Sequence, residues 1–128
     1  MKKKKVFLSF IFIVVILFLI SLFSINNLSK LEVLTIENIN LSNAKDGTFN
    51  GSYEVFPVSA EVNVTIKNKK IVDVELLKHN NGKGESAEIL TEKVVENQSL
   101  KVDIVSGATY SSKVILKSIE NALNKSIN

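Results

Sequence analysis

The beginning of the chain is almost uniformly apolar. Residues Val6 to Ile25 contain no charged residue, no proline and no glycine. Twenty helical residues at about 1.5 Å rise per residue span roughly 30 Å, the thickness of the hydrocarbon core of a bilayer. The pattern therefore predicts one transmembrane helix over residues 6–25.

Four lysines, Lys2 to Lys5, precede this apolar run. Clustered positive charge stays on the cytoplasmic side, so we expect residues 1–5 to form a cytoplasmic tail and the C-terminal part to be extracytoplasmic. A cleaved signal peptide is the alternative, but its apolar core is usually about 7–15 residues long and ends at small residues. The run here is longer, and Ser24-Ile25-Asn26-Asn27 is a poor cleavage site. We therefore expect a single-pass anchor in the cytoplasmic membrane.

The segment after the apolar run is polar with scattered aliphatic residues. Leu28, Leu31 and Leu34 recur every three residues and favour a short extension of the helix. The asparagines that follow favour irregular structure. We interpret residues 26–45 as a stalk that holds a domain, residues 46–128, just clear of the lipid.

Alternation of apolar and polar residues predicts strands in the first half of this domain. Residues 48–55 are rich in strand-forming residues, with Gly51 as a candidate bulge. Residues 58–67 alternate strictly, and Asn68-Lys69 is a plausible two-residue turn into a third strand over residues 71–78. On that strand we expect Val72, Val74 and Leu76 to face inward and Asp73 and Glu75 to face outward.

Helical periodicity dominates the second half. Residues 85–98 predict one helix, and a final helix is expected to start at an N-cap of Ser111 or Ser112 and to run to about Lys125. Between them, residues 102–105 form a short apolar run that we interpret as a strand end. The predicted fold is α+β, a small antiparallel sheet with packed helices, preceded by one transmembrane helix.

Composition excludes several classes of function. The chain has no cysteine and a single histidine, His79, which leaves no disulfides, no thiolate or multi-histidine metal site, and no lipidated cysteine. The four N-terminal lysines account for more than the whole net charge of +3. The basic pI thus reflects membrane topology, and we expect no nucleic-acid partner and no metal.

The segment with the clearest chemistry runs from Asp103 to Ser112. It combines a glycine turn, several hydroxyl residues and the start of a helix. Free N–H groups at a helix N-terminus attract anions, and Gly107 and Ala108 allow a ligand close to the backbone. This is a plausible phosphate site. On composition alone, an ordinary loop followed by a capped helix is the preferred interpretation of the segment.

A resemblance favours the phosphate site. Asp103-x-x-Ser106-Gly107-Ala108-Thr109 resembles the D-x-x-[ST]-G-A-T flavinylation motif of the FMN-binding domain family (FMN_bind). This family includes the flavin-carrying subunits of sodium-pumping NADH–quinone reductases and related complexes. Two upstream blocks also resemble it: Asp46-Gly47-Thr48-Phe49-x-Gly51, and the strand pair around Asn68-Lys69.

The resemblance implies a cofactor and a mode of attachment. Thr109 corresponds to the threonine to which a flavin transferase bonds FMN through its phosphate, as phosphothreonyl-FMN. Asp103, Ser106, Gly107 and Ala108 match the residues around that phosphate, and Ser111 and Ser112 the hydroxyl positions that open the next helix. Tyr110 and His79 are further candidate FMN contacts.

Other residues near the expected site allow two interpretations. His79 either tunes the flavin or passes a proton, or it is a packing residue. Many family members carry Glu-Thr-Pro-Gly after this position, whereas this chain has Asn80-Asn81-Gly82-Lys83-Gly84, where the glycines either let a loop close on the flavin or form a plain turn. Tyr53 and Phe56 either stack on the ring or belong to the core.

The resemblance implies an electron carrier that exchanges electrons with redox partner proteins or a quinone. A self-sufficient enzyme is less expected, because the chain is too small for separate nicotinamide and flavin sites, and we assign no catalytic residue. The alternatives are a flavin-donating subunit of a reductase, a protein that binds FMN non-covalently without electron transfer, and a membrane-tethered structural domain with no cofactor.

Overall fold

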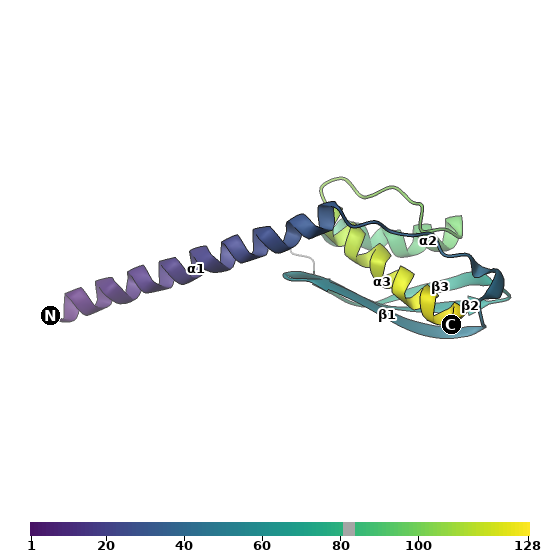
Figure 1. Cartoon of the computed structure of the whole chain (residues 1–128), viewed down its shortest axis with the longest axis horizontal. Helices are drawn as coiled ribbons and strands as arrows, with labels where there is room; N and C mark the ends of the chain where they lie inside the picture. The colour runs from purple at the N-terminus through teal and green to yellow at the C-terminus, as the bar shows by residue number, and fades with distance from the viewer. Residues whose placement is uncertain (81–83) are drawn as a thin grey trace.

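A computed structural model describes residues 1–80 and 84–128. A long helix, α1 (Lys2–Glu32), leads to a three-stranded antiparallel sheet with the order β1-β2-β3. The C-terminal helix α3 and the shorter α2 cover one side of the sheet (Figure 1). The predicted α+β fold is confirmed. The elements after α1 are η1 (Leu41–Asn43), β1 (Gly47–Val55), β2 (Val58–Lys67), β3 (Lys70–Asn80), η2 (Glu85–Ile89), α2 (Leu90–Asn97) and α3 (Thr109–Ile127).

The central strand β2 follows its sequence pattern. All five of its predicted inward residues are buried, and they alternate with more exposed polar ones: Val58, Ala60, Val62, Val64 and Ile66. The predicted turn after it is also confirmed, because Asn68 and Lys69 have φ of 52° and 62°. Two successive positive φ values give the backbone twist that joins adjacent antiparallel strands.

Strand β3 departs from simple alternation. Its pairing with β2 skips Val72 and Leu77, each of which lies at a register shift. The two residues are 48% and 41% exposed, so the expectation that Val72 faces inward is wrong. A bulge places an extra residue in one strand and changes the phase of the side chains beyond it. The bulge at Leu77 turns His79 inward, opposite Ala60.

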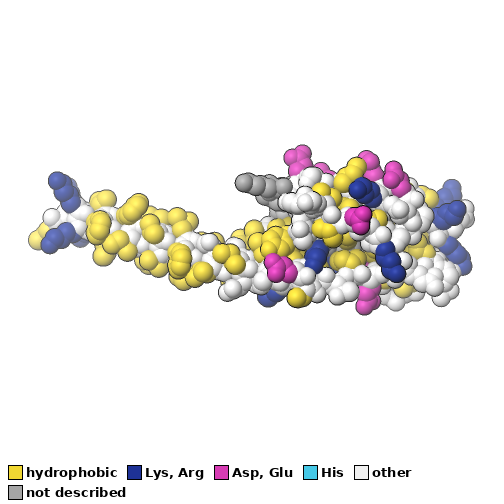
Figure 2. Space-filling view, turned by 90° about the horizontal axis from the view of Figure 1, so that it is seen from above, with side chains coloured by type: hydrophobic (Ala, Val, Ile, Leu, Met, Phe, Trp, Pro, Cys, Tyr) yellow, Lys and Arg dark blue, Asp and Glu magenta, His cyan; other side chains and the backbone are white. Residues whose placement is uncertain are grey.

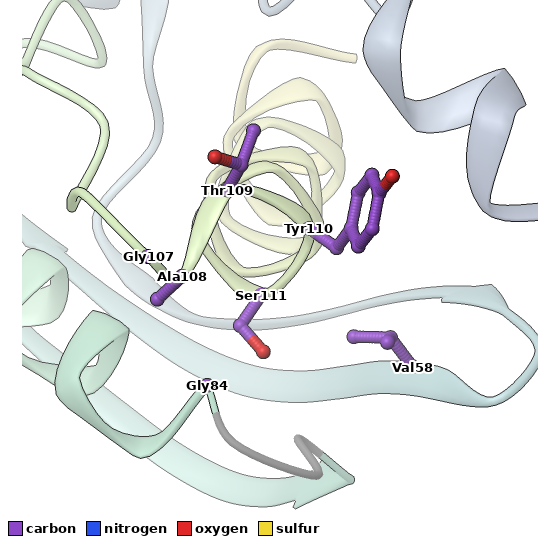
Figure 3. Close-up of a pocket in the computed structure, with 7 residues that line it drawn as sticks. All are labelled: Val58, Gly84, Gly107, Ala108, Thr109, Tyr110 and Ser111. Atoms are coloured by element: carbon purple, nitrogen blue, oxygen red, sulfur yellow. The ribbon is translucent and has the colours of Figure 1, made fainter.

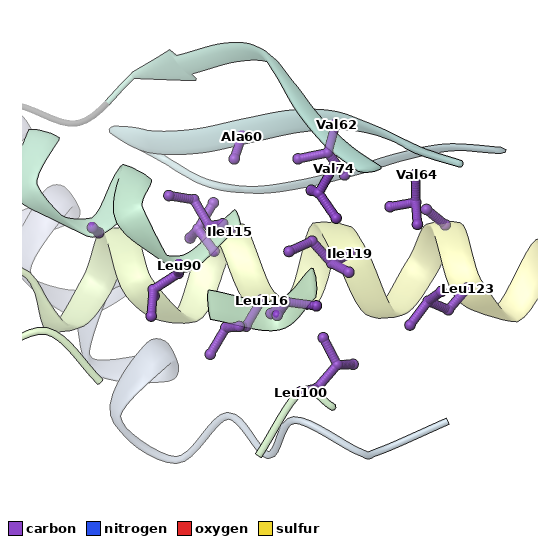
Figure 4. Packing of buried hydrophobic residues seen from close by; sticks show 14 of the residues in the cluster. Ala60, Val62, Val64, Val74, Leu90, Leu100, Ile115, Leu116, Ile119 and Leu123 are labelled. Atoms are coloured by element: carbon purple, nitrogen blue, oxygen red, sulfur yellow. The ribbon is translucent and has the colours of Figure 1, made fainter. Parts of the chain in front are cut away.

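The hydrophobic core lies between the sheet and α3. The apolar stripe of this helix, predicted from its periodicity, is fully buried against β1 and β2 (Figure 4). Gly51 is not a bulge, because β1 pairs with β2 without interruption. It is instead the point of closest approach of α3. A Cβ on Gly51 would overlap the carbonyl oxygen of Ser118 and lie 2.6 Å from the backbone nitrogen of Ala122.

The region predicted as one helix over residues 85–98 is divided. Its first turn is the 3₁₀ segment η2, and α2 then ends at Asn97, followed by the C-cap residue Gln98 with a left-handed φ of 51°. The Gln98 side chain bonds both backbone groups of Ile71, which ties the end of α2 to β3. Residues 102–105 form no strand, contrary to the prediction, because they lie outside the sheet and have no ladder partner.

The N-terminal helix is longer than the apolar run, and its end contacts the domain. The large apolar side chains of residues 6–25 are exposed, which gives the helix a continuous apolar surface (Figure 2). It is the one helix within the described residues that is long and apolar enough to cross a membrane. This fits a single-pass anchor, and an N-terminal signal sequence has the same properties.

The segment expected to be a stalk has more contact with the domain than a free tether would have. Leu31 is fully buried. The N–H of Glu37 donates to the Glu120 carboxylate at 3.0 Å, and the N–H of Lys45 donates to the Ser126 carbonyl at 2.9 Å. Residues 33–45 therefore run along the domain after α1 ends.

Candidate FMN site at the start of helix α3

The predicted phosphate segment lies at the N-terminus of α3, beside a cavity of about 150 Å³ (Figure 3). The helix begins at Thr109, with Ala108 as its N-cap, so the prediction of a Ser111 or Ser112 cap is wrong. Both serines instead occupy the first turn. The structure brings five predicted residues into the cavity wall, together with Val58 and Gly84: Gly107, Ala108, Thr109, Tyr110 and Ser111.

The helix N-terminus is suited to an anion. No side chain among the described residues caps it, and its first turn contains no acidic residue. The first N–H groups of a helix have no intrahelical partner, and the helix dipole adds positive potential there. Thr109 is exposed, so its hydroxyl is accessible from solvent.

Gly107 determines how the chain enters the helix. Its φ is +79°, a conformation that side chains other than glycine rarely adopt. A Cβ at this position would have nothing within 4 Å. The requirement for glycine is therefore conformational, and the same open space leaves room for a ligand beside the turn.

The two serines have different environments. Ser112 is fully buried, donates its hydroxyl to the Ala108 carbonyl at 2.7 Å and accepts the N–H of Val105 at 3.1 Å. It stabilises the loop from inside rather than facing a ligand. Ser111 lines the cavity, and its Oγ lies 2.9 Å from Nε2 of His79.

His79 is the centre of a hydrogen-bonded chain. Its side chain is 3% exposed, and its Nδ1 lies 2.9 Å from Oε1 of Glu88, whose side chain is 42% exposed. A carboxylate only accepts hydrogen bonds, so Nδ1 donates in the contact with Glu88. Nε2 and the Ser111 hydroxyl share the second hydrogen bond, in which either atom can be the donor.

Two predicted residues lie outside the cavity wall. Asp103 and Ser106 are both exposed on the preceding loop, and neither lines the cavity. Exposure is compatible with recognition by another protein. Gly82 and Lys83, also considered from the sequence, lie outside the described residues.

Three further expectations concern side chains near the site. Tyr53 packs against the hydrophobic core, and Phe56 contacts an aromatic ring of α1. Asp73 and Glu75 are exposed on the outer face of β3, as their alternation predicts. Sequence reasoning missed Glu88, because nothing in the local pattern distinguishes it from the neighbouring Glu85.

The donor set fits a phosphate monoester. An exposed hydroxyl, an uncapped helix N-terminus and open space over Gly107 surround a small cavity. Its volume is below the roughly 300–1,000 Å³ typical of pockets that enclose a whole ligand. The cavity thus suits the phosphate end of a larger molecule.

Comparison with known proteins agrees with this chemistry. The profile of the FMN-binding domain family matches residues 57–124, just over half of the chain. The match runs from the start of β2 through most of α3 and includes both His79 and the Thr109 segment. The chain belongs to the FMN-binding domain family and is an FMN-binding flavoprotein. No curated protein sequence matches it.

Proposed function

We propose that this protein is a membrane-anchored, extracytoplasmic electron carrier with FMN bonded through its phosphate to Thr109. The observation that carries the proposal is the position of Thr109. It is exposed, it is the first residue of an uncapped helix, and it lines the cavity that suits a phosphate.

The attachment step follows from the resemblance to flavinylated family members. A flavin transferase would supply FAD, and the Thr109 oxygen would attack the phosphorus on the FMN side of the pyrophosphate. A new O–P bond forms, the pyrophosphate bond breaks, and AMP leaves as the hydroxyl proton is removed. An exposed side chain at a helix N-terminus suits reaction inside another enzyme's active site.

Within the attached site, the surrounding residues would hold the phosphate. The first N–H groups of α3 and the helix dipole would offset its negative charge. Ser111, held by His79, adds a hydroxyl on the cavity wall. Asp103 and Ser106 are exposed, and we propose that the transferase recognises them.

Electron carriage suits the size and the anchoring of the chain. FMN supplies one- and two-electron redox chemistry, and the protein supplies position and retention. A covalent bond prevents loss of the flavin outside the cytoplasm, where Lys2–Lys5 would direct the domain. The proposed partners are a redox protein or a quinone at the membrane.

The attachment is tested by expressing the full chain with a flavin transferase and measuring in-gel flavin fluorescence after denaturation. Wild type is expected to fluoresce, Thr109→Ala to be dark, and Thr109→Ser to retain some signal because serine keeps the hydroxyl. Thr48→Ala is the matched control, since Thr48 is an exposed threonine on β1 that bonds only Thr65 among the described residues. Fluorescent Thr109→Ala protein would refute the attachment site.

Electron carriage has its own test. Flavin-loaded protein in vesicles is mixed anaerobically with a lipid-soluble quinol, and flavin absorbance is followed. Bleaching that reverses on adding an oxidised acceptor supports carriage. Loaded protein whose flavin never changes redox state with any membrane donor would instead favour a binding role without electron transfer.

A further inference from the structure

The turn between β1 and β2 lies beside the transmembrane helix. Phe56 follows β1, and its ring centroid is 6.4 Å from that of Phe23 on α1. Phe56 is nevertheless 49% exposed. Figure 1 shows this end of the sheet alongside α1, whereas the C-terminus of α3 lies at the opposite end of the domain.

The position of Phe23 gives the depth of this contact. Phe23 is two residues from the end of the apolar run Val6–Ile25. At about 1.5 Å per residue it lies roughly 3 Å inside the hydrocarbon boundary. A ring that contacts Phe23 therefore lies near the boundary between hydrocarbon and headgroups.

A second contact fixes the domain further along the same helix. The Tyr110 hydroxyl donates to the Glu32 carboxylate at 3.2 Å, and Lys113 Nζ donates to the Glu32 carbonyl at 2.6 Å. Glu32 is seven residues beyond Ile25, about 10 Å past the boundary. The headgroup layer is about 5–7 Å thick on each side, so this contact lies just outside it. The domain therefore contacts α1 at two distances from the bilayer, through Phe56 and through Tyr110 with Lys113. Together these contacts orient the domain so that the β1–β2 turn faces the lipid.

We propose that the β1–β2 turn is a second membrane attachment, which inserts Phe56 into the outer surface of the bilayer. This inference rests on α1 being an uncleaved anchor. We expect Phe56 to contact lipid rather than another protein, because the turn continues the exposed apolar surface of α1 at the depth of Phe23. The charged side chain nearest to the turn in sequence, Glu54 near the end of β1, is exposed two residues before Phe56 and would meet the headgroups.

The attachment orients the flavin site. Val58, two residues after Phe56, and Tyr110, which contacts Glu32, both line the cavity. The cavity therefore lies at the membrane-facing end of the domain. A redox partner within the bilayer would then lie close to it.

The chain has no tryptophan, so single tryptophan variants report one position each. Phe56→Trp, Phe18→Trp and Lys67→Trp are prepared as full chains without flavin in phosphatidylcholine vesicles that carry quenchers at shallow or deep positions. Phe18 is near the middle of the apolar run, and Lys67 is exposed at the far end of β2. Circular dichroism checks that each variant folds.

We expect shallow quenchers to reduce Phe56→Trp emission several-fold more than Lys67→Trp emission, and deep quenchers to act most strongly on Phe18→Trp. Phe56→Trp emission that is quenched no more than that of Lys67→Trp, with Phe18→Trp strongly quenched, would overturn the attachment while leaving the anchor intact. An unquenched Phe18→Trp would overturn both. None of these outcomes depends on flavin loading.

Discussion

Nε2 of His79 lies 2.9 Å from Oγ of Ser111, although the two residues are 32 positions apart in the chain. The contact exists because the bulge at Leu77 turns the end of β3 inward. It joins the end of the sheet to the first turn of α3, beside the threonine proposed to carry FMN. Through Glu88 the same ring also holds η2.

Replacing His79 by alanine should destabilise the domain. The change removes the side-chain hydrogen bonds to Glu88 and Ser111, and it leaves the buried Ser111 hydroxyl without its histidine partner, which typically costs about 1–3 kcal/mol. Urea denaturation of His79→Ala should show a lower midpoint than wild type. Lys78→Ala is the control, because the Lys78 side chain is 80% exposed. An unchanged midpoint for His79→Ala would show that the chain of bonds is not structural.

Gly51→Ala should be more harmful than its small size suggests. The added methyl group would overlap the Ser118 carbonyl and crowd Ala122, so α3 has to move away from β1. Overpacking of this kind costs about 1–3 kcal/mol or more. Thermal unfolding should reveal a lower Tm, while Ser52→Ala, at the exposed neighbouring position, should behave as wild type. Equal Tm values for both variants would contradict the close packing.

At Gly107, the damage should depend on backbone conformation and not on side-chain volume. A φ of +79° strains alanine and valine, whereas asparagine tolerates left-handed conformations better. We expect Gly107→Asn to keep more flavin loading than Gly107→Ala, although asparagine is larger. In-gel fluorescence measures loading. The reverse order would indicate that space over the turn, rather than φ, is limiting.

Ser112→Ala should reduce stability more than Ser106→Ala. Ser112 is fully buried and satisfies the Val105 N–H, whereas Ser106 is exposed. Leaving a buried N–H unpaired costs about 1–3 kcal/mol. Ser106→Ala should instead lower loading by the transferase at unchanged stability. Unfolding midpoints measure stability, and in-gel fluorescence measures flavin loading. If both variants changed stability and loading to the same extent, Ser112 would not be a structural residue distinct from Ser106.

Tyr110 should make stability depend on pH in the alkaline range. Its hydrogen bond to Glu32 raises the pKa of Tyr110 above the usual 10.0, with smaller contributions from burial and from the Glu32 charge. Since the folded pKa is raised, the stabilisation is present below about pH 10 and is lost as the pH rises through the folded value. Wild type should therefore lose stability more steeply than Tyr110→Phe in this range. The lysines titrate in the same pH range, but they are the same in both proteins and do not affect the comparison. Parallel curves of stability against pH for the two proteins would contradict the hydrogen bond between Tyr110 and Glu32.

The parts of the fold that obey a simple period could be predicted from the sequence. Strict alternation identified β2, and the apolar stripe identified α3, because both elements bury one continuous face. The turn at Asn68 and Lys69 was predicted correctly because asparagine tolerates the positive φ that such a turn requires. The motif also located the cavity wall around Thr109.

What the sequence did not reveal depends on contacts between distant segments. The bulges at Val72 and Leu77 change the phase of β3 without any glycine or proline to mark them. Gly51 is a site of helix contact, which only the packing of α3 reveals. Glu88 acquires its role through the fold of the chain around His79. The docking of Glu32 on Tyr110 likewise joins segments that share no local pattern.

We propose that Thr109 carries FMN by a phosphoester bond. The most direct test is the intact mass of the full chain co-expressed with a flavin transferase, followed by peptide mapping. We expect a mass gain of one FMN less one water, located on the peptide that contains Thr109 and absent from Thr109→Ala. An unmodified mass, under conditions where the transferase loads a known acceptor protein, would contradict it.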